Sequence, residues 1–263
     1  MDRAVGIIPS RFGSTRFPGK SLADLCGKPM IQWVYEQAKK SSLLEQVIVA
    51  TDDERICESV RRFGGCAWLT ASEHTCGTTR VAEVASKLDA EIIINIQGDE
   101  PLIEPDMIDQ VVQGMQSDPA VYMATLKKRI INEDDVNNPH VVKVVTDKDG
   151  YALYFSRAGI PYEAVSGQRS AVSKKQKTDE RIAVSSQHCY KHIGLYGYRR
   201  EFLLKINSLP YSVLEAVESL EQLRILENGY KIKVMETEYD TIGVDTPEDL
   251  VKVARIVGRI EHG

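Results

Sequence analysis

The sequence lacks the features that mark membrane, secreted and nucleic-acid-binding proteins. None of its apolar runs approaches the length that crosses a bilayer, and the run that begins at Ala4 is too short for a secretory leader. The net charge of −5 disfavours nucleic acid and acidic membranes as partners. These absences predict a cytoplasmic protein that binds neither nucleic acid nor membrane.

Cysteine is also scarce, and its spacing forms no pattern. The five cysteines are an odd number and include no C-x-x-C pair. A disulfide framework and a zinc site are therefore both disfavoured. We expect these cysteines to be small, buried, reduced side chains.

Strand-like and helix-like patterns alternate through the first half of the 263 residues. Apolar runs at 5–9, 46–50 and 91–96 are typical of strands, and apolar residues at helical spacing follow the first two. The run at 91–96 is almost continuous, as expected for a central strand covered on both faces. This alternation predicts a three-layer α/β core with a mostly parallel sheet.

The second half of the chain begins with a different pattern. Asp147-Lys-Asp-Gly150 lies between two apolar runs and predicts a β-hairpin. The polar stretch at 163–190 predicts a long loop. No linker is visible, so residues 1–263 are predicted to form one domain, with a hairpin and loop excursion at about 140–200.

Further elements are predicted towards the C-terminus. Residues 192–198 are typical of a strand, and 213–227 of a single helix. Thr246 as N-cap and Pro247 at the first helical position predict the start of the last helix.

A basic loop follows the first apolar run. Pro9-Ser-Arg-Phe-Gly-Ser-Thr-Arg-Phe-Pro-Gly-Lys20 carries Arg11, Arg16 and Lys20 and contains no acid. Backbone amides, hydroxyls and cations at the carboxyl end of a strand suit a polyphosphate. The loop has neither a Walker turn nor G-x-G-x-x-G, and a surface loop with solvated charges is the alternative.

Two aspartates are candidate magnesium ligands. Asp99 follows the most apolar strand, where ligands bind in open α/β sheets, although an Asx-turn before Pro101 is the alternative. Asp245 follows Val244, which suits a strand end facing a cleft, but it also adjoins a helix cap. Two such carboxylates over a triphosphate would form a magnesium clamp.

The basic loop at 9–20 resembles the opening motif of the 3-deoxy-manno-octulosonate cytidylyltransferase (CMP-Kdo synthetase) family. Sialic-acid cytidylyltransferases are more distantly similar, because they carry a different first loop. The other motifs that resemble the first family follow in its order along nearly the whole chain: Ala50-Thr-Asp-Asp53, Asn95-Ile-Gln-Gly-Asp-Glu-Pro101, Tyr151-Ala-Leu-Tyr-Phe-Ser-Arg157, His192-Ile-Gly-Leu-Tyr-Gly-Tyr-Arg199, Leu220-Glu-Gln-Leu-Arg224 and Gly243-Val-Asp-Thr-Pro-Glu-Asp249.

This resemblance implies a fold and a reaction. The fold is a Rossmann-like three-layer nucleotidyltransferase fold with a predominantly parallel central sheet and a smaller β-rich dimerisation excursion. The reaction is the Mg²⁺-dependent activation of Kdo (3-deoxy-D-manno-octulosonate) by CTP, which gives CMP-Kdo and pyrophosphate for lipopolysaccharide biosynthesis. The resemblance also implies a homodimer.

The resemblance further implies roles for individual residues. Those expected to be catalytic are Arg11, Lys20, Asp99 and Asp245, of which the two aspartates bind the metal. Those expected to bind the nucleotide are Arg11, Ser14, Arg16, Lys20 and Arg80. Those expected to bind the sugar acid are Gln97, Arg157, His192, Tyr196, Glu221 and Gln222. Thr79 departs from the family, which usually has Glu there to orient the arginine that follows.

Elementary geometry bears on the sugar residues. His192 and Tyr196 are four positions apart on a predicted strand and so share a face, although a lone strand histidine is more often structural. Glu221 and Gln222 are adjacent on a predicted helix and diverge by about 100°, so only one of them would point squarely at a ligand.

Three alternatives to this function stay open. The sugar could be an amino-substituted Kdo analogue. The chain could instead be a sugar-1-phosphate nucleotidyltransferase that uses another nucleoside triphosphate. It could also be a nucleotide-sensing module without catalysis on the same scaffold.

Overall fold

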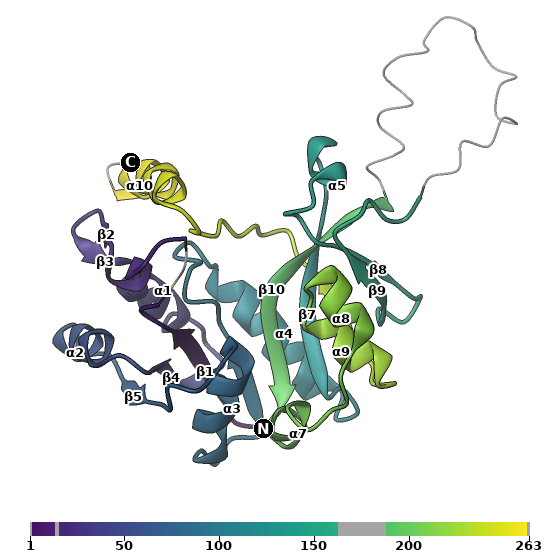
Figure 1. The fold of residues 1–263 in the computed structure, drawn as a ribbon, viewed down its shortest axis with the longest axis horizontal. Coiled ribbons are helices and arrows are strands. Elements are labelled where there is room, and N and C mark those ends of the chain that lie inside the picture. The colour runs from purple at the N-terminus through teal and green to yellow at the C-terminus, as the bar shows by residue number, and fades with distance from the viewer. Residues whose placement is uncertain (1, 14–15, 163–187, 262–263) are drawn as a thin grey trace, which may run out of the picture. The chain divides into compact units, whose positions relative to one another are not determined.

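The computed structural model of the protein describes residues 2–13, 16–162 and 188–261, and the chain divides into two compact units (Figure 1). The first unit comprises residues 1–124, 194–208 and 239–263, and the second comprises 125–193 and 209–238. The predicted excursion at about 140–200 falls mostly in the second unit, which also takes in residues on either side of it. A single domain with a dimerising excursion stays a prediction.

A mostly parallel sheet forms the centre of the first unit. Strand β1 (Ala4–Ser10) pairs in parallel with β4 (Leu44–Thr51) and with β6 (Ile92–Asn95). Strand β5 (Ala67–Leu69) pairs in parallel with β4, and the end of β10 (Tyr190–Arg199) pairs antiparallel with β6. All four residues of β6 are buried, as expected for a central strand. The predicted α/β fold with a predominantly parallel sheet is confirmed.

Helices connect and flank these strands in the first unit. The helices are α1 (Met30–Ala38), α2 (Glu54–Arg62), α3 (Gly77–Ser86), α4 (Pro105–Ser117), α7 (Arg200–Ile206) and α10 (Pro247–Glu261), with the short elements η1 (Lys20–Leu22), β2 (Asp24–Leu25) and β3 (Lys28–Pro29). Thr246 Oγ1 accepts the N–H of Asp249 at 3.2 Å, which confirms the predicted cap of the last helix. Within the described ranges, no helix is long and apolar enough to cross a bilayer.

The second unit is built from short strands and short helices. Its strands are β8 (Lys143–Thr146), β9 (Ala152–Ser156), β11 (Lys233–Glu236), most of β7 (Met123–Arg129) and the start of β10; its helices are α5 (Asp134–Asn137), α8 (Val213–Glu218) and α9 (Gln222–Glu227). Strands β8 and β9 are antiparallel neighbours, and the turn between them contains Gly150 with φ of 76°. The predicted hairpin is confirmed.

The prediction of one helix over 213–227 is wrong. Helix α8 ends at Ser219, which adopts a left-handed conformation with φ of 53°, and α9 begins three residues later. A left-handed residue ends a helix because it turns the next amide back towards the preceding carbonyls, and here Leu220 N–H binds Glu215 O at 3.2 Å. Glu221 is the N-cap of α9, and Gln222 is its first residue. The predicted divergence of about 100° between these two side chains assumed one continuous helix and does not apply.

The cysteines are free, as predicted, but they are not all buried. Cys57 and Cys189 are buried, whereas Cys26 is exposed and two others are partly exposed. In the part of the chain that the structure describes, no group of three or more His, Cys, Asp and Glu side chains gathers at one point.

Candidate active site

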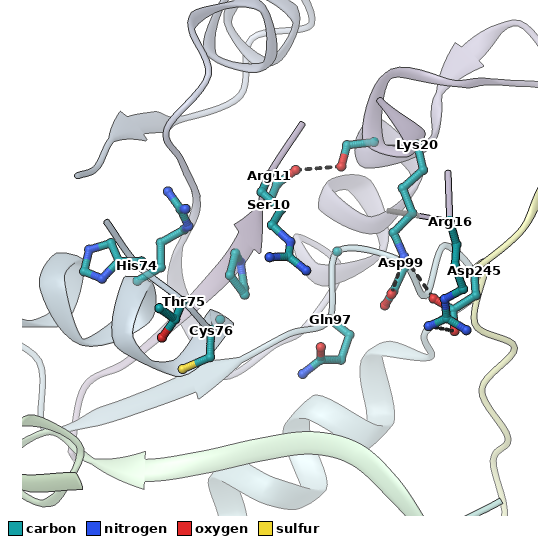
Figure 2. Close-up of a pocket in the computed structure, with 15 residues that line it drawn as sticks. Ser10, Arg11, Arg16, Lys20, His74, Thr75, Cys76, Gln97, Asp99 and Asp245 are labelled. Atoms are coloured by element: carbon teal, nitrogen blue, oxygen red, sulfur yellow. Dashed lines mark hydrogen bonds and ion pairs between the residues drawn. The ribbon is translucent and has the colours of Figure 1, made fainter. Parts of the chain in front are cut away.

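A cavity of about 420 Å³ opens in the first unit where the first loop, the start of α3 and the segment after β6 meet (Figure 2). Lys20, Asp99, Asp245 and Arg16 lie together on one side of it, and His74, Thr75 and Cys76 lie on another. The residues that line it are Pro9, Ser10, Arg11, Arg16, Lys20, Ser21, His74, Thr75, Cys76, Gly77, Arg80, Gln97, Gly98, Asp99 and Asp245.

The first loop is closed by a glycine that no other residue can replace without strain. Gly19 has φ of 72°, its N–H donates to Phe12 O at 2.9 Å, and a Cβ at this position would lie 2.9 Å from the Phe12 ring. The guanidinium of Arg55 stacks on that ring, 3.4 Å from its centroid, and is itself bonded to Asp53 at the start of α2. These contacts set the direction in which the loop presents Lys20.

Close approach of two chain segments brings Asp99 and Asp245 together. A Cβ at Gly98 would lie 2.8 Å from Pro9 O, so the absence of a side chain lets the segment after β6 pass against the end of β1. Asp99 O then accepts the N–H of Val244 at 2.8 Å, which places Asp245 next to the same strand end. The two aspartates predicted as magnesium ligands therefore both lie within reach of Lys20 in the basic loop.

Lys20 is the centre of a charged cluster at this end of the cavity. Its Nζ donates to Asp99 Oδ2 at 2.7 Å, to Asp245 Oδ1 at 3.3 Å and to Val244 O at 3.0 Å. Arg16 Nη2 lies 3.0 Å from the other oxygen of Asp245. The Lys20 side chain is 15% exposed, so these bonds are only weakly screened by water.

The two aspartates fit a magnesium site. Two carboxylates that converge on one cation, beside a cavity lined by further cations, form the donor set that Mg²⁺ takes when substrate phosphates supply the other oxygens. The ammonium of Lys20 provides the positive charge between them. Arg11 also lines the cavity and forms no ion pair with any residue that the structure describes.

Glu100 is a partly buried acid beside this cluster that sequence reasoning missed. Its Oε2 is buried and has no hydrogen-bond partner among the described residues. Burial, and then the charge of Asp99, raise the pKa of Glu100 to about 8, against the opposing hydrogen bond with Thr241. The Glu100 carboxyl is therefore mostly neutral at pH 7.

Arg80 is held on the wall of the cavity by Asp52. The arginine is 3% exposed, and its Nη2 donates to Asp52 Oδ2 at 2.8 Å while its Nη1 donates to Thr70. Thr79 instead donates its hydroxyl to Cys76 O at 2.9 Å in the first turn of α3. In this chain, where residue 79 is a threonine, the carboxylate that orients Arg80 is thus Asp52, which is distant in sequence.

His74 has a structural partner that the sequence did not reveal. Its Nε2 lies 2.7 Å from Glu83 Oε2, and Glu83 also accepts from Lys87 Nζ and from the N–H of Ala71, both at 2.9 Å. These three donors, with His74 first, lower the pKa of Glu83 to about 2. The ionised carboxylate ties the residues before α3 to the helix itself.

The predicted sugar residues fall in both units. Gln97 and Tyr196 belong to the first unit, where Gln97 Nε2 donates to Gly194 O at 3.0 Å and Tyr196 pairs with Asn95. The other four, in the second unit, are Arg157, His192, Glu221 and Gln222. Strand β10 contains both His192 and Tyr196, which confirms the predicted strand. Of the adjacent pair, Gln222 is 5% exposed and Glu221 is partly exposed.

Arg157 is bonded to main-chain oxygens. Its Nε donates to Glu218 O at 2.8 Å, Nη1 to Pro139 O at 3.0 Å and Nη2 to Ser219 O at 3.3 Å. Lys143 is fully buried. Its Nζ donates to the carbonyl of Arg157 at 2.7 Å and to two further main-chain carbonyls. The sequence did not single out this lysine, because a lysine in a short strand usually marks the solvent face.

Two predictions fall outside the described residues. Ser14, predicted to bind phosphate, is one of them. The predicted loop at 163–190 is the other, since residues 163–187 of it are not described.

Comparison with known proteins gives consistent results. The model of the cytidylyltransferase family matches residues 5–232. A 3-deoxy-manno-octulosonate cytidylyltransferase of Geotalea uraniireducens is 54% identical over 251 residues, covering 95% of this chain and 97% of that protein. The enzyme of the same name from Geobacter sulfurreducens is also 54% identical, over 94% of this chain and 96% of that protein.

Solved structures are similar as well. A CMP:2-keto-3-deoxy-manno-octonic acid synthetase complexed with CTP is 43% identical, with a TM-score of 0.86 over 98% of this chain and 99% of that one. A 4-diphosphocytidyl-2C-methyl-D-erythritol synthase of Anaerococcus prevotii is 13% identical, with a TM-score of 0.60 over 98% of this chain and 99% of that one. The second likeness concerns the fold alone.

Proposed function

Because the chain belongs to the 3-deoxy-manno-octulosonate cytidylyltransferase family, we propose that it couples CTP to Kdo and releases CMP-Kdo and pyrophosphate. The observation that carries this proposal is the meeting of Lys20 with Asp99 and Asp245 at one end of a cavity. Cations beside paired carboxylates suit a nucleoside triphosphate together with a divalent ion.

The proposed reaction is a displacement at phosphorus. The anomeric hydroxyl oxygen of Kdo forms a bond to the α-phosphorus of CTP, the bond from that phosphorus to the bridging oxygen breaks, and its electron pair leaves with pyrophosphate. The hydroxyl proton passes to solvent. Arg11, Arg16 and Lys20 bind the phosphate oxygens, hold the triphosphate in line and stabilise the charge on the leaving group.

Asp99 and Asp245 are the residues that would hold Mg²⁺. Bound there, Mg²⁺ supplies charge neutralisation for the phosphate oxygens and lowers the pKa of the attacking hydroxyl. Lys20 pairs with both carboxylates, so the acids that would hold the ion also hold this lysine at the same end of the cavity. The three N–H donors of its ammonium suit the phosphate oxygens of the triphosphate.

The sugar acid is assigned to the remaining predicted residues. Kdo presents hydroxyls and a carboxylate, which call for amide, phenol, imidazole and carboxylate partners such as those of Gln97, Tyr196, His192, Glu221 and Gln222. A sugar contact for Arg157 also stays a prediction, although its Nε, Nη1 and Nη2 donate to main-chain carbonyls.

The setting of the enzyme is likewise a proposal. By its resemblance to the family, we assign the chain to a homodimer that works in the cytoplasm and supplies CMP-Kdo to lipopolysaccharide biosynthesis. The match to relatives over nearly their whole length supports this assignment.

A pyrophosphate-release screen tests the function. CTP, UTP, GTP and ATP are each combined with Kdo, with its 8-amino analogue and with sugar 1-phosphates, with Mg²⁺ or with EDTA. Turnover of CTP and Kdo that EDTA abolishes is expected. Preference for the amino analogue would change the assigned sugar, and turnover of a sugar 1-phosphate would overturn the assignment. Tight CTP binding without any turnover would indicate a nucleotide sensor.

A further inference from the structure

The first loop closes on itself directly between two of its cations. Phe12 O accepts the N–H of Gly19 at 2.9 Å, and these two residues adjoin Arg11 and Lys20 in the sequence. Arg11 and Lys20 line the cavity, whereas Phe12 and Gly19 do not. The spacing of the two cations therefore depends on a closure that lies outside the cavity.

The ring of Phe12 has two neighbours that hold this closure. The backbone of Gly19 packs against the ring, since a Cβ at that position would lie 2.9 Å from it. The guanidinium carbon of Arg55 lies 3.4 Å from the ring centroid, which is the separation of a stacked cation–π contact. A displacement of the ring would therefore disturb the backbone of the closure as well.

Asp53 fixes the plane of the Arg55 guanidinium. Arg55 Nε donates to Asp53 Oδ1 at 2.9 Å, and Arg55 Nη2 donates to Asp53 Oδ2 at 2.5 Å. Two such parallel bonds determine the orientation of a guanidinium as well as its position. The Arg55 side chain is 60% exposed, but its charge is matched by this carboxylate. It therefore presents a flat, oriented face to Phe12.

The support for Arg55 begins in the sheet. Asp53 N–H donates to Oγ1 of Thr51, a fully buried residue of β4, at 3.2 Å. Asp53 Oδ1 also accepts the main-chain N–H of Arg55 at 3.0 Å, as the N-cap of α2. Thr51 pairs with Ser10 of β1, the residue before Arg11. The support and the loop therefore leave the sheet at neighbouring strand ends.

We infer that Arg55 is a positioning residue for CTP: it stacks on Phe12, keeps the first loop closed at Gly19, and so holds Arg11 and Lys20 at the spacing that binds the triphosphate. This inference rests on the proposed function, which assigns both cations to the phosphates. It adds a determinant of CTP affinity that acts through the loop and not by contact with the substrate.

A long-range charge effect is the competing explanation. Arg55 is an exposed cation near the phosphate-binding loop, so its charge alone could attract CTP. Lysine separates the two explanations, because it keeps the charge but lacks the planar fork that pairs with Asp53 and stacks on a ring. High salt separates them again, because it screens exposed charges much more than it weakens stacking.

Steady-state kinetics of the full-length protein provide the first readout. Arg55→Gln keeps the N-cap bond of α2, which uses the main-chain N–H. It should raise the KM for CTP about twofold to fivefold, the worth of an exposed cation–π contact, with the KM for Kdo unchanged. Arg55→Lys should show the same rise at low and high salt. Arg61→Gln, which breaks an exposed ion pair with Glu54 on the same helix, is the matched control.

A double-mutant cycle tests whether Arg55 acts through Phe12. Phe12→Leu keeps an apolar side chain and removes the ring, and it should raise the KM for CTP at least as much as Arg55→Gln does. Arg55→Gln combined with Phe12→Leu should then have no larger effect than Phe12→Leu alone. Calorimetric titration with CTP and Mg²⁺, without Kdo, should give the same pattern in the Kd. Effects that multiply in the double variant would overturn the inference.

The outcomes separate this inference from the proposed function. A parental KM for CTP in Arg55→Gln, equal changes in both KM values, or restoration by Arg55→Lys would overturn the role of Arg55 in an enzyme that still makes CMP-Kdo. If Phe12→Leu does not fold, calorimetry of Arg55→Gln and Arg55→Lys at two salt concentrations decides. Absence of CMP-Kdo formation by the parent would refute the proposed function, while the Kd for CTP would still test the action of Arg55 on the loop.

Discussion

Two lysines, one in each unit, bind oxygen atoms in contrasting ways. Lys20 in the first unit meets two side-chain carboxylates and one main-chain carbonyl. Lys143 in the second unit meets three main-chain carbonyls, those of Asn138, Val141 and Arg157, at 2.6 to 2.8 Å. Lys143 is fully buried, and burial lowers its pKa, whereas the Lys20 side chain is 15% exposed.

The difference separates a binding site from a structural clamp. Carboxylate side chains can turn towards another cation, so the partners of Lys20 can be exchanged when a ligand enters. Main-chain carbonyls cannot leave Lys143 without movement of the backbone segments that carry them. The arginines repeat the contrast, because Arg16 pairs with a carboxylate and Arg157 with main-chain oxygens.

The largest effect on turnover is expected for the two carboxylates that bind Lys20. Asp99→Asn and Asp245→Asn should each lower kcat by about a thousandfold or more, because the proposed metal loses half of its protein ligands. Thermal unfolding should shift by only a few degrees. Asp149→Asn, an exposed aspartate of the second unit, is the control and should leave turnover unchanged. Near-parental turnover in either site variant would remove that residue from the proposed metal site.

The same substitution in both lysines tests the comparison directly. Lys143→Met should lower the free energy of unfolding by about 3 kcal/mol or more, because three buried carbonyls lose a charged donor. Lys20→Met should change it by about 1 kcal/mol or less, yet lower kcat about a hundredfold. Urea unfolding and pyrophosphate release measure the two quantities.

Exposed Lys148→Met serves as the control for both lysines and should change neither quantity. Two results would contradict the comparison of the two lysines: a Lys143→Met variant as stable as its parent, or a Lys20→Met variant that is strongly destabilised but keeps the parental kcat.

A smaller effect is expected at Glu83, which is 23% exposed. Like Lys143, Glu83 has a main-chain partner, because it accepts the N–H of Ala71. Its pKa falls from the ordinary 4.5 to about 2 on folding. Its charge therefore stabilises the fold fully above pH 4.5, and this stabilisation is lost as the pH falls towards 2. Glu83→Gln should cost about 1–2 kcal/mol at pH 7 and less at pH 3.5.

Urea unfolding at the two pH values measures the Glu83 effect. Glu58→Gln, on an exposed ion pair of α2 with 3.6 Å between its charged atoms, is the control and should cost about 0.5 kcal/mol or less at both pH values. A loss for Glu83→Gln that does not shrink on acidification would show that the carboxylate charge is not what stabilises the region.

Local sequence patterns predicted most of the elements that depend on interactions between residues close in sequence. The strand at 5–9, the hairpin around Gly150 and the cap at Thr246 each depend on neighbouring residues, and the structure confirms all three. The single helix over 213–227 was wrong, because its apolar spacing continues through Ser219 although the backbone does not. A left-handed serine carries no signal in the sequence.

Contacts between residues that are distant in sequence could not be predicted from local sequence patterns. Asp52 orients Arg80, and Thr125 contacts His192, yet both are separated from their partners by tens of residues. Hydrogen bonds of this kind depend on which strands become neighbours, and one sequence does not show that.

The sequence by itself determined which chemistry is present: a basic loop without acids, one aspartate after an apolar strand, another before the last helix, and an α/β alternation. Composition and spacing are properties of the chain before it folds. The tertiary structure alone decided how those charges are used, since it joins Lys20 to Asp99 and Asp245 and surrounds Lys143 with carbonyls. The physical reason is that a lysine can bind a ligand only where its partners can be exchanged, and the fold determines which oxygen atoms become its partners.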